Sequence, residues 1–221
     1  MLTVTEENYL KAIYKCQTTH TVATTTQLAE LLNTTAASVT DMLKKLCEKN
    51  LVIYAKYQGA CLSEEGKKIA LQIIRKHRLW EVFLVEKLGY TWDTVHPIAE
   101  QLEHIQSDDL IDKLDKFLNY PQFDPHGDPI PNAQGKIVVQ PQCPLSALKP
   151  KEKGSFTGVA DHSPEFLRYL NKINLKLGDI CEVYEVNEFD KSMLLKINSV
   201  KISLSEPTAK NILVCIIDKN E

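Results

Sequence analysis

The sequence predicts a mainly α-helical protein with α+β parts: a winged helix-turn-helix, then a helical segment, then a small β-barrel. Apolar residues recur at helical spacing as far as residue 118. Four prolines between residues 121 and 131 interrupt that pattern. From about residue 154, short apolar runs separated by turns replace it. The 221 residues, 43% hydrophobic and 25% charged, suffice for several small domains with real cores.

The first sixty residues are typical of a DNA-binding module. Residues 5–17 predict an amphipathic helix that begins after a threonine cap. Two further helices are expected over residues 26–32 and 36–49, and the tight turn between them makes a helix-turn-helix. Residues 51–63 follow as two short strands with a glycine at the turn, which predicts a β-hairpin wing.

The second helix of this pair begins with small polar residues on its outward side. Such residues can approach base edges and phosphates when a helix enters the major groove. Two ordinary packed helices and a hairpin would give part of the same pattern, so the prediction depends on the agreement of turn length, polar face and wing. The residues expected to contact DNA are Thr35, Ala37, Ser38, Thr40, Asp41 and Lys44 from the helix and Lys56, Tyr57 and Gln58 from the wing.

Residues 64–88 predict one long amphipathic helix, and helices over residues 96–104 and 108–118 follow it. The long helix carries more apolar residues than one small winged helix needs, which predicts a dimer surface. These residues are Ile69, Ile73, Ile74, Leu79, Phe83 and Leu84.

The last third of the chain predicts a small β-barrel. Residues 132–153 show little periodicity and are expected to be a linker. A short helix is expected over residues 164–171. Several short strands separated by turns are typical of a barrel. The strands are expected within residues 154–161, 179–187, 193–204 and 211–217.

Charge is distributed unevenly. Residues 1–80 hold 11 Lys and Arg against 7 Asp and Glu, residues 81–131 hold 3 against 11, and residues 132–221 hold 12 against 11. The basic part suits phosphate and the acidic middle part suits cations.

The six cysteines include no CxxC pair. This argues against a zinc ribbon or a disulfide framework and predicts reduced, half-buried thiols. No apolar stretch is long enough to span a bilayer, and the start of the chain lacks the features of a signal peptide. The cytoplasm is therefore the expected location.

One stripe in the acidic part carries four potential metal ligands. Offsets of four, three and four residues place His96, Glu100, Glu103 and His104 on one face of a helix. Two carboxylates and two imidazoles suit a first-row divalent cation. A solvated face with weak acid–imidazole pairs would have the same pattern, so both interpretations stay open on spacing alone.

Two smaller groups have the same chemistry. His77 and Glu81 repeat the four-residue offset in the preceding helix, although an exposed ion pair explains them equally well. Asp124 and His126 lie two residues apart between prolines, where a polar turn is the alternative.

Five segments, taken in order, resemble the diphtheria-toxin-repressor/manganese-transport-regulator family of iron- or manganese-activated dimeric transcriptional repressors. They are YLKAIY, TAASVTDMLKKLCEKNLVIYAKYQGACLSEEGKKIA, RKHRL, AEQLEHIQSD and FDPHGDPIP, and they cover nearly the whole chain. The resemblance implies a winged helix-turn-helix domain over residues 1–63 and a helical metal-binding and dimerisation domain over residues 64–131. It further implies a linker over residues 132–153 and an SH3-like (FeoA-like) domain over residues 154–221.

The resemblance also implies two metal positions in each subunit. The site tied to DNA binding would take its ligands from the first helix and from a later Glu-x-x-Glu-His motif, which here gives Asn8, Glu100, Glu103 and His104. An ancillary site would use His77, Glu81 and His96 in the repressor subgroup. In the longer manganese-type subgroup it would use Glu81, Asp124, His126 and an acid of the C-terminal domain, for which Asp161 is the best match and His162 a rival. Because the FDPHG segment is present, the second set is favoured, and His77 and His96 become supporting residues.

Departures from the family pattern bear on the choice of metal. Asn8 stands where the family usually has Asp or Met, so that site loses a charge. Glu100 and Asp124 occupy positions that are Cys in some relatives. With oxygen and nitrogen donors only, both sites suit Mn²⁺; Fe²⁺ is the alternative, and Zn²⁺ or Co²⁺ would bind in vitro.

The expected function is a Mn(II)-dependent, dimeric, DNA-binding repressor of metal-ion homeostasis that recognises a double-stranded operator. The alternatives are an Fe(II)-dependent repressor of iron uptake and a metal-independent DNA-binding regulator. A metalloenzyme is the rival from another class, because HPIAEQLEH contains two histidines and carboxylates that could activate water. The motif lacks the HExxH order and no nucleophile accompanies it, so no enzymatic activity is expected.

Overall fold

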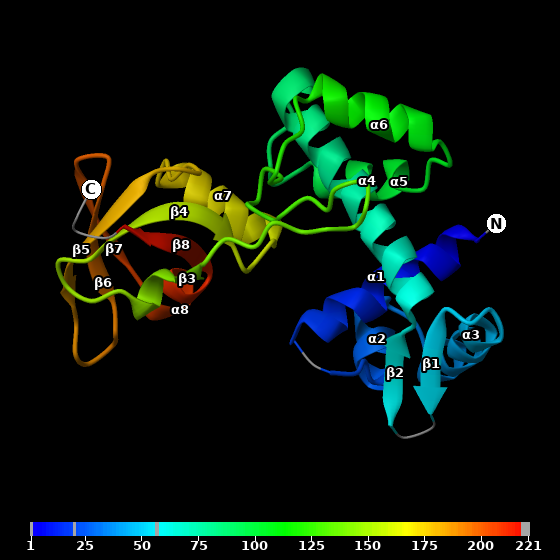
Figure 1. Ribbon diagram of the computed structural model, residues 1–221. Coiled ribbons are helices and arrows are strands. Elements are labelled where there is room, and N and C mark those ends of the chain that lie inside the picture. Colours follow the sequence, from blue (N-terminus) through cyan, green and yellow to red (C-terminus); the bar gives the residue numbers. More distant parts are fainter. Residues whose placement is uncertain (1, 20, 56–57, 218–221) are drawn as a thin grey trace. The chain divides into compact units, whose positions relative to one another are not determined.

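The structure is a computed structural model that describes residues 2–19, 21–55 and 58–217 (Figure 1). Its residues form two compact units. The first unit comprises Met1–Trp80, Ala99–Asn119 and Ile130–Ile137, and the second comprises Glu81–Ile98, Tyr120–Pro129 and Val138–Glu221. None of the helices in the described part of the chain is both long and apolar enough to cross a membrane.

The first unit contains the predicted helix-turn-helix and wing. Its core is built from buried apolar residues of the first three helices, including Leu10, Ile13, Leu28, Leu43 and Leu46. The hairpin strands pair antiparallel from Val52↔Leu62 to Ala55↔Gly59. The helices are α1 (Val4–Thr19), α2 (Thr25–Leu31) and α3 (Ala36–Glu48), and the strands are β1 (Val52–Ala55) and β2 (Gly59–Leu62).

Side-chain caps determine where the two helices of the helix-turn-helix begin. The Thr24 hydroxyl accepts the backbone N–H of Gln27, whose side-chain oxygen accepts the N–H of Thr24, so α2 begins with a capping box. Thr35 caps α3 by accepting the N–H of Ser38 at 3.2 Å. A cap of this kind stabilises a helix by about 1 kcal/mol. The helix ends lie within about two residues of those expected from the sequence.

The long helix α4 (Glu64–Leu88) has the bounds that the sequence predicts, and α6 (Asp108–Phe117) begins after the cap residue Ser107. Arg75 joins these two helices. Its guanidinium lies 3.2 Å from Asp112 and 2.7 Å from Asp115, and the residue is only 3% exposed. A buried arginine requires such partners because an unpaired charge in the interior is costly.

The apolar residues of α4 are largely buried within the chain itself. Ile73 is 2% exposed, Leu79 is 0% exposed and Leu84 is 4% exposed. Burial within the chain accounts for these three residues, whereas Ile69 and Phe83 are only half-buried. The dimer surface on this helix stays a prediction.

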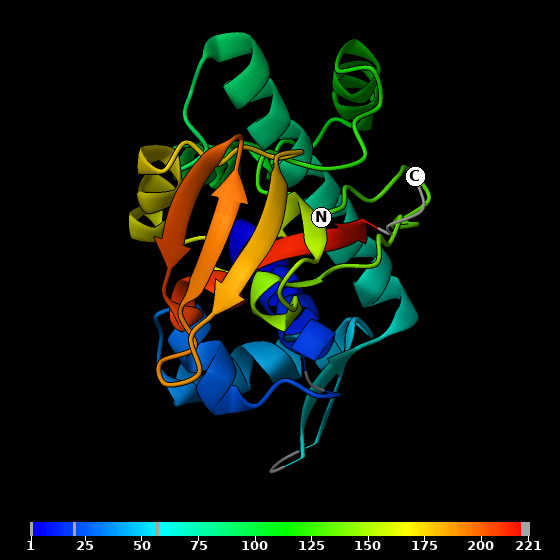
Figure 2. The same ribbon diagram turned by 90° about the vertical axis from the view of Figure 1, so that its left-hand side faces the viewer.

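The second unit contains an antiparallel sheet in which the described strands have the order β3-β8-β4-β5-β6-β7. In Figure 2, β5, β6 and β7 run side by side while β8 crosses them steeply. Phe156 and Leu195 are fully buried in its core. The strands are β3 (Cys143–Pro144), β4 (Lys153–Val159), β5 (Ile180–Val186), β6 (Met193–Ile197), β7 (Val200–Leu204) and β8 (Ile212–Ile217); the helices are η1 (Leu145–Ala147), α7 (Pro164–Lys172) and α8 (Glu206–Lys210).

Two elements differ from the sequence-based expectation. The segment 132–153, expected to be a linker, supplies β3, which pairs with β8, and the buried residues Leu145 and Leu148. The pairing partner lies about seventy residues further along the chain, so local periodicity did not indicate the strand. The short helix α8 was not expected, although Ser205 caps it and a proline stands in its first turn.

Candidate metal centres and DNA-binding surface

The stripe predicted over residues 96–104 is divided by the structure. Helix α5 (His96–Leu102) ends before Glu103, and Glu103 and His104 lie in the turn that follows. The expectation of four ligands on one helix face is therefore wrong. His96 belongs to the second unit, whereas Glu100, Glu103 and His104 belong to the first.

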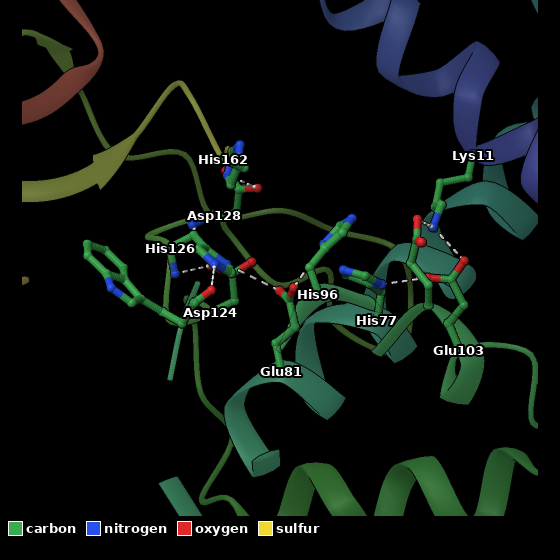
Figure 3. A network of polar contacts seen from close by, with 11 residues as sticks. Lys11, His77, Glu81, His96, Glu103, Asp124, His126, Asp128 and His162 are labelled. Carbon is green, nitrogen blue, oxygen red and sulfur yellow. Dashed lines mark hydrogen bonds and ion pairs between the residues drawn. The ribbon is translucent and has the colours of Figure 1, made fainter. Parts of the chain in front are cut away.

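In the first unit these residues form the Glu103 cluster, which we define as Glu7, Lys11, His77, Glu100, Glu103 and His104. Glu103 is fully buried. One of its carboxylate oxygens lies 2.5 Å from Lys11 Nζ and the other lies 2.6 Å from His77 Nδ1 (Figure 3). Lys11 Nζ is also 3.6 Å from Glu100 Oε1. A buried carboxylate needs this pairing because desolvation penalises an isolated charge.

His104 is held by the first helix. Its Nδ1–H donates to Glu7 Oε2 at 2.5 Å, and its Nε2 lies 3.6 Å from Glu103 Oε1. The Gln106 amide also donates to Glu7, at 2.8 Å. Contacts from Glu7 and Lys11 thus join α1 to the turn after α5.

The structure adds Glu7 and Lys11 to the residues that the sequence indicated for this site. Asn8, the ligand expected from α1, lies beside Glu7 and is half-buried. Lys11 follows Glu7 by four residues and Asn8 by three, so all three lie close together on the helix surface. This spacing is the signal in the sequence that places Glu7 and Lys11 beside Asn8.

The second unit contains the His126 cluster, defined as Glu81, His96, Asp124 and His126. Glu81, Asp124 and His126 are all buried, and each offers a ligand atom within 4.8 Å of the others. Glu81 Oε2 lies 3.5 Å from His126 Nδ1, and Glu81 Oε1 lies 3.2 Å from His96 Nδ1 (Figure 3). His96, with 55% of its side chain exposed, lies at the edge of the cluster.

Backbone contacts orient His126 so that Nδ1 faces the carboxylates. Its Nε2–H donates to the carbonyl of Trp92 at 2.8 Å, and the Trp92 ring stacks on the imidazole. An imidazole that donates through one nitrogen presents the other nitrogen as a ligand. Burial alone would lower the pKa of His126, but the hydrogen bond and charge of Glu81, the charge of Asp124 and the Trp92 carbonyl raise it to about 9.

The loop that carries Asp124 and His126 is held by its own hydrogen bonds. Asp124 Oδ1 accepts the backbone N–H of His126 at 2.8 Å and that of Asp128 at 2.9 Å. These two bonds fix the turn that places Asp124 and His126 side by side.

Asp161 and His162, the two candidates for a further ligand of the ancillary site, lie in different positions. Asp161 is not in the group formed by Glu81, Asp124 and His126 among the described residues, and its Oδ1 accepts the N–H of Ser163 at 2.8 Å. His162 meets the His126 ring edge-on, with centroids 5.3 Å apart, and its Nε2 lies 3.5 Å from Asp128 Oδ2. The rival His162 thus contacts the cluster directly.

Both clusters have donors suited to a divalent metal ion. Carboxylate oxygens and imidazole nitrogens suit Mn²⁺ or Fe²⁺, and neither cluster contains a thiolate. The carboxylates of both clusters already face nitrogen atoms: the Lys11 ammonium lies beside Glu103, and His126 Nδ1 lies 3.5 Å from Glu81 Oε2. The donor types fit a cation, and in the Glu103 cluster coordination would have to displace the Lys11 ammonium.

The predicted DNA-binding face lies largely on the solvent-exposed side of α3. Lys44 pairs with Asp41 at 3.5 Å, and both side chains are well exposed. Thr40 is half-buried and its hydroxyl donates to the Ala36 carbonyl at 2.9 Å. Lys56 and Tyr57 of the wing lie outside the described residues. The remaining candidates, Thr35, Ala37, Ser38 and Gln58, are exposed.

A buried carboxylate connects α1 to α3. Glu6 is fully buried, and its Oε1 lies 2.7 Å from Lys49 Nζ and 3.0 Å from Lys45 Nζ. Burial alone would raise the pKa of Glu6, but hydrogen bonds from Lys49, the Thr3 N–H and Lys45 lower it to about 2. Glu6 therefore stays ionised and holds the two helices together.

Comparisons with known proteins match each part of the chain. Residues 1–60 match the N-terminal DNA binding domain of the iron dependent repressors, residues 63–132 match their metal binding and dimerisation domain, and residues 143–215 match the FeoA domain. The iron-dependent repressor IdeR of Mycobacterium tuberculosis is 34% identical over 127 residues, which are 58% of this chain and 55% of that protein. The chain thus spans about half the length of such curated relatives.

Other relatives are matched over more of their length. The HTH-type transcriptional regulator MntR of Oceanobacillus iheyensis is 33% identical over 120 residues, 54% of this chain and 81% of that protein. A solved manganese-dependent transcriptional repressor in complex with manganese is 35% identical with a TM-score of 0.84, covering 96% of this chain and 100% of that one. These matches confirm the predicted fold class, including the FeoA-type C-terminal domain. The chain therefore belongs to the diphtheria-toxin-repressor/manganese-transport-regulator family of metal-dependent, DNA-binding transcriptional repressors.

Proposed function

We propose that this protein is a Mn(II)-dependent dimeric repressor that binds operator DNA and serves metal-ion homeostasis. The observation that carries the proposal is the shared use of α1. Within two turns of this helix, Glu6 contacts Lys45 of α3, while Glu7 and Lys11 contact His104 and Glu103. A cation bound at that cluster would act on the same helix that holds α3.

We propose Asn8, Glu100, Glu103 and His104 as the ligands of the switch site, with His77 orienting Glu103 through its Nδ1–H. We propose Glu81, Asp124 and His126 as the ancillary site, with Asp161 or His162 as a further ligand and His96 in a supporting role. When bound, the ion supplies the positive charge that these carboxylates require. The Glu7–His104 contact would hold α1 in place while the metal ion binds.

The DNA contacts proposed for α3 and the wing follow from their exposure and from the position of the helix-turn-helix. A dimer would present two such helices to successive major-groove faces of a palindromic site. A metal ion activates DNA binding by shifting the equilibrium between a DNA-competent and an incompetent conformation. It does so only if it binds the DNA-competent conformation more tightly, by a few kcal/mol.

Mn²⁺ is favoured over Fe²⁺ by the absence of sulfur among the proposed ligands and by the manganese-dependent relative that covers 96% of this chain. Fe²⁺ is the second candidate, because the iron-dependent repressors match a large part of the same sequence. The DNA-binding experiment that tests the proposal therefore compares the two metals.

The test is DNA binding by fluorescence anisotropy, using a duplex selected from a random pool with the full-length protein and MnCl₂. Wild type, Glu103→Ala/His104→Ala and the exposed helix control Gln101→Ala are compared after chelation, with MnCl₂ and, under anaerobic conditions, with FeCl₂. Ionic strength is held constant because phosphate contacts make affinity strongly salt-dependent.

Wild type and Gln101→Ala are expected to bind at least tenfold more tightly with Mn²⁺ than after chelation, and the double variant is expected to lose that difference. Equal affinity with and without metal in wild type would overturn the proposal. If DNA binding responds to FeCl₂ at a lower free metal concentration than to MnCl₂, iron rather than manganese is the activator.

A further inference from the structure

Lys11 places a positive charge at the position where the Glu103 cluster would hold a metal ion. Its Nζ lies 2.5 Å from Glu103 Oε1 and 3.6 Å from Glu100 Oε1, so it bridges two of the proposed ligands. The Lys11 side chain is only 22% exposed and Glu103 has no exposed side-chain area. This is a partly enclosed pair rather than a solvated surface contact.

An ammonium group and a metal ion cannot share these oxygen atoms. A protonated lysine has three donors and no acceptor, so it cannot serve as a ligand. Its charge repels a nearby dication, and the repulsion is greater where water is partly excluded. Coordination by Glu100 and Glu103 therefore requires Lys11 to leave.

Lys11 can leave without disturbing the helix that carries it. Its ammonium stands on a flexible four-carbon stem, which can turn toward solvent while α1 stays in place. Glu7, one turn earlier on α1, keeps its contact with His104. Metal binding would thus exchange one cation for another against the same carboxylates.

We propose that Lys11 is a tethered competitor for the metal ion, which stabilises the metal-free Glu103 cluster and sets the metal concentration at which the site fills. The proposal rests on the proposed function, because it takes Glu100 and Glu103 to be ligands. It assigns to Lys11 control of the response threshold rather than a place among the ligands.

The first experiment measures Mn²⁺ affinity by calorimetry, with free Mn²⁺ followed by electron paramagnetic resonance. Lys11→Met keeps the length of the stem and removes the charge, Lys11→Arg keeps the charge, and Lys15→Met removes an exposed charge from the same helix as the matched control. Each is prepared in the wild-type and His126→Ala backgrounds, so that binding at the His126 cluster is counted separately.

Lys11→Met is expected to lower the Mn²⁺ dissociation constant at least tenfold, which corresponds to about 1.4 kcal/mol, and to lower the stability of the metal-free protein. Lys11→Arg and Lys15→Met are expected to stay near the wild-type affinity. If wild type binds Mn²⁺ and Lys11→Met binds it with unchanged or weaker affinity, the Lys11 proposal alone is overturned. Absence of Mn²⁺ binding by wild type overturns the proposed function.

A second measurement needs no variant and so remains decisive if Lys11→Met does not fold. Wild-type protein is acetylated briefly with and without MnCl₂, and modification of Lys11 and Lys15 is mapped by peptide mass spectrometry. Lys11 is expected to be protected without metal and to become several-fold more reactive with it, while Lys15 does not change. Equal protection of Lys11 in both conditions contradicts displacement.

Discussion

Gly127 is the residue at which a single methyl group should do most damage to the His126 cluster. It lies between His126 and Asp128 with φ +87°, in the left-handed region. A Cβ at this position would stand 1.9 Å from the Thr157 carbonyl oxygen and 2.5 Å from the Gly158 Cα. Both obstacles are backbone atoms, so a rotamer change cannot relieve the clash.

The cost of Gly127→Ala has two parts. An L-residue in a left-handed conformation costs about 1–2 kcal/mol, and forcing an extra carbon into a packed site costs typically about 1–3 kcal/mol more. Thr157 belongs to β4, whose pairing with β8 opposes movement away from the loop. The expected loss in the free energy of unfolding is therefore about 2–5 kcal/mol.

The assay is urea unfolding of the metal-free protein, with Gly178→Ala as the matched control. Gly178 lies in the same unit with φ +90°, and a Cβ there would meet nothing within 4 Å. The control should lose only the conformational part, about 1–2 kcal/mol. Equal losses in the two variants would refute the argument from the Thr157 contact.

Three further outcomes are expected. Thr24→Ala should lower the free energy of unfolding by about 1 kcal/mol in urea, because it removes the capping box of α2; no loss would mean that the cap is redundant. Glu6→Gln should reduce the effect of Mn²⁺ on DNA affinity in anisotropy while calorimetric Mn²⁺ affinity stays within about twofold, because it weakens the α1–α3 connection; an unaltered metal response would contradict that role. Burial raises the pKa of Cys181 to about 12 from its usual 9. The protonated thiol contributes to stability fully below pH 9, and this contribution is lost as pH rises toward 12. In urea unfolding, the free energy of unfolding of wild type should therefore fall by about 1 kcal/mol more than that of Cys181→Ala between pH 8 and pH 10; parallel pH profiles would exclude this titration.

The two clusters share one electrostatic arrangement despite their different residues. Glu103 faces an ammonium and an imidazole, and Glu81 faces two imidazoles. Two buried carboxylates of the acidic middle part thus each face nitrogen partners within the chain. The excess of carboxylates alone therefore does not indicate cation binding; the positions of these partners must be known as well.

Local patterns predicted the parts of the structure that depend on neighbouring residues. The helix over residues 64–88, the helix-turn-helix and most strands followed from periodicity and capping, which operate over a few residues. The thiols also follow the expectation, since five of the six cysteines are half-buried and none forms a disulfide.

The sequence by itself determined the fold class and the family and predicted the ligand types, because helical spacing, turn residues and donor chemistry are properties of short segments. Only the tertiary structure decided which donors meet. It ended α5 at Leu102, separated His96 from Glu103, and placed Lys11 against Glu103 across 92 positions of the chain. The physical reason is that a buried carboxylate takes whichever positive partner the packing brings near, and helical spacing carries no information about partners on another helix.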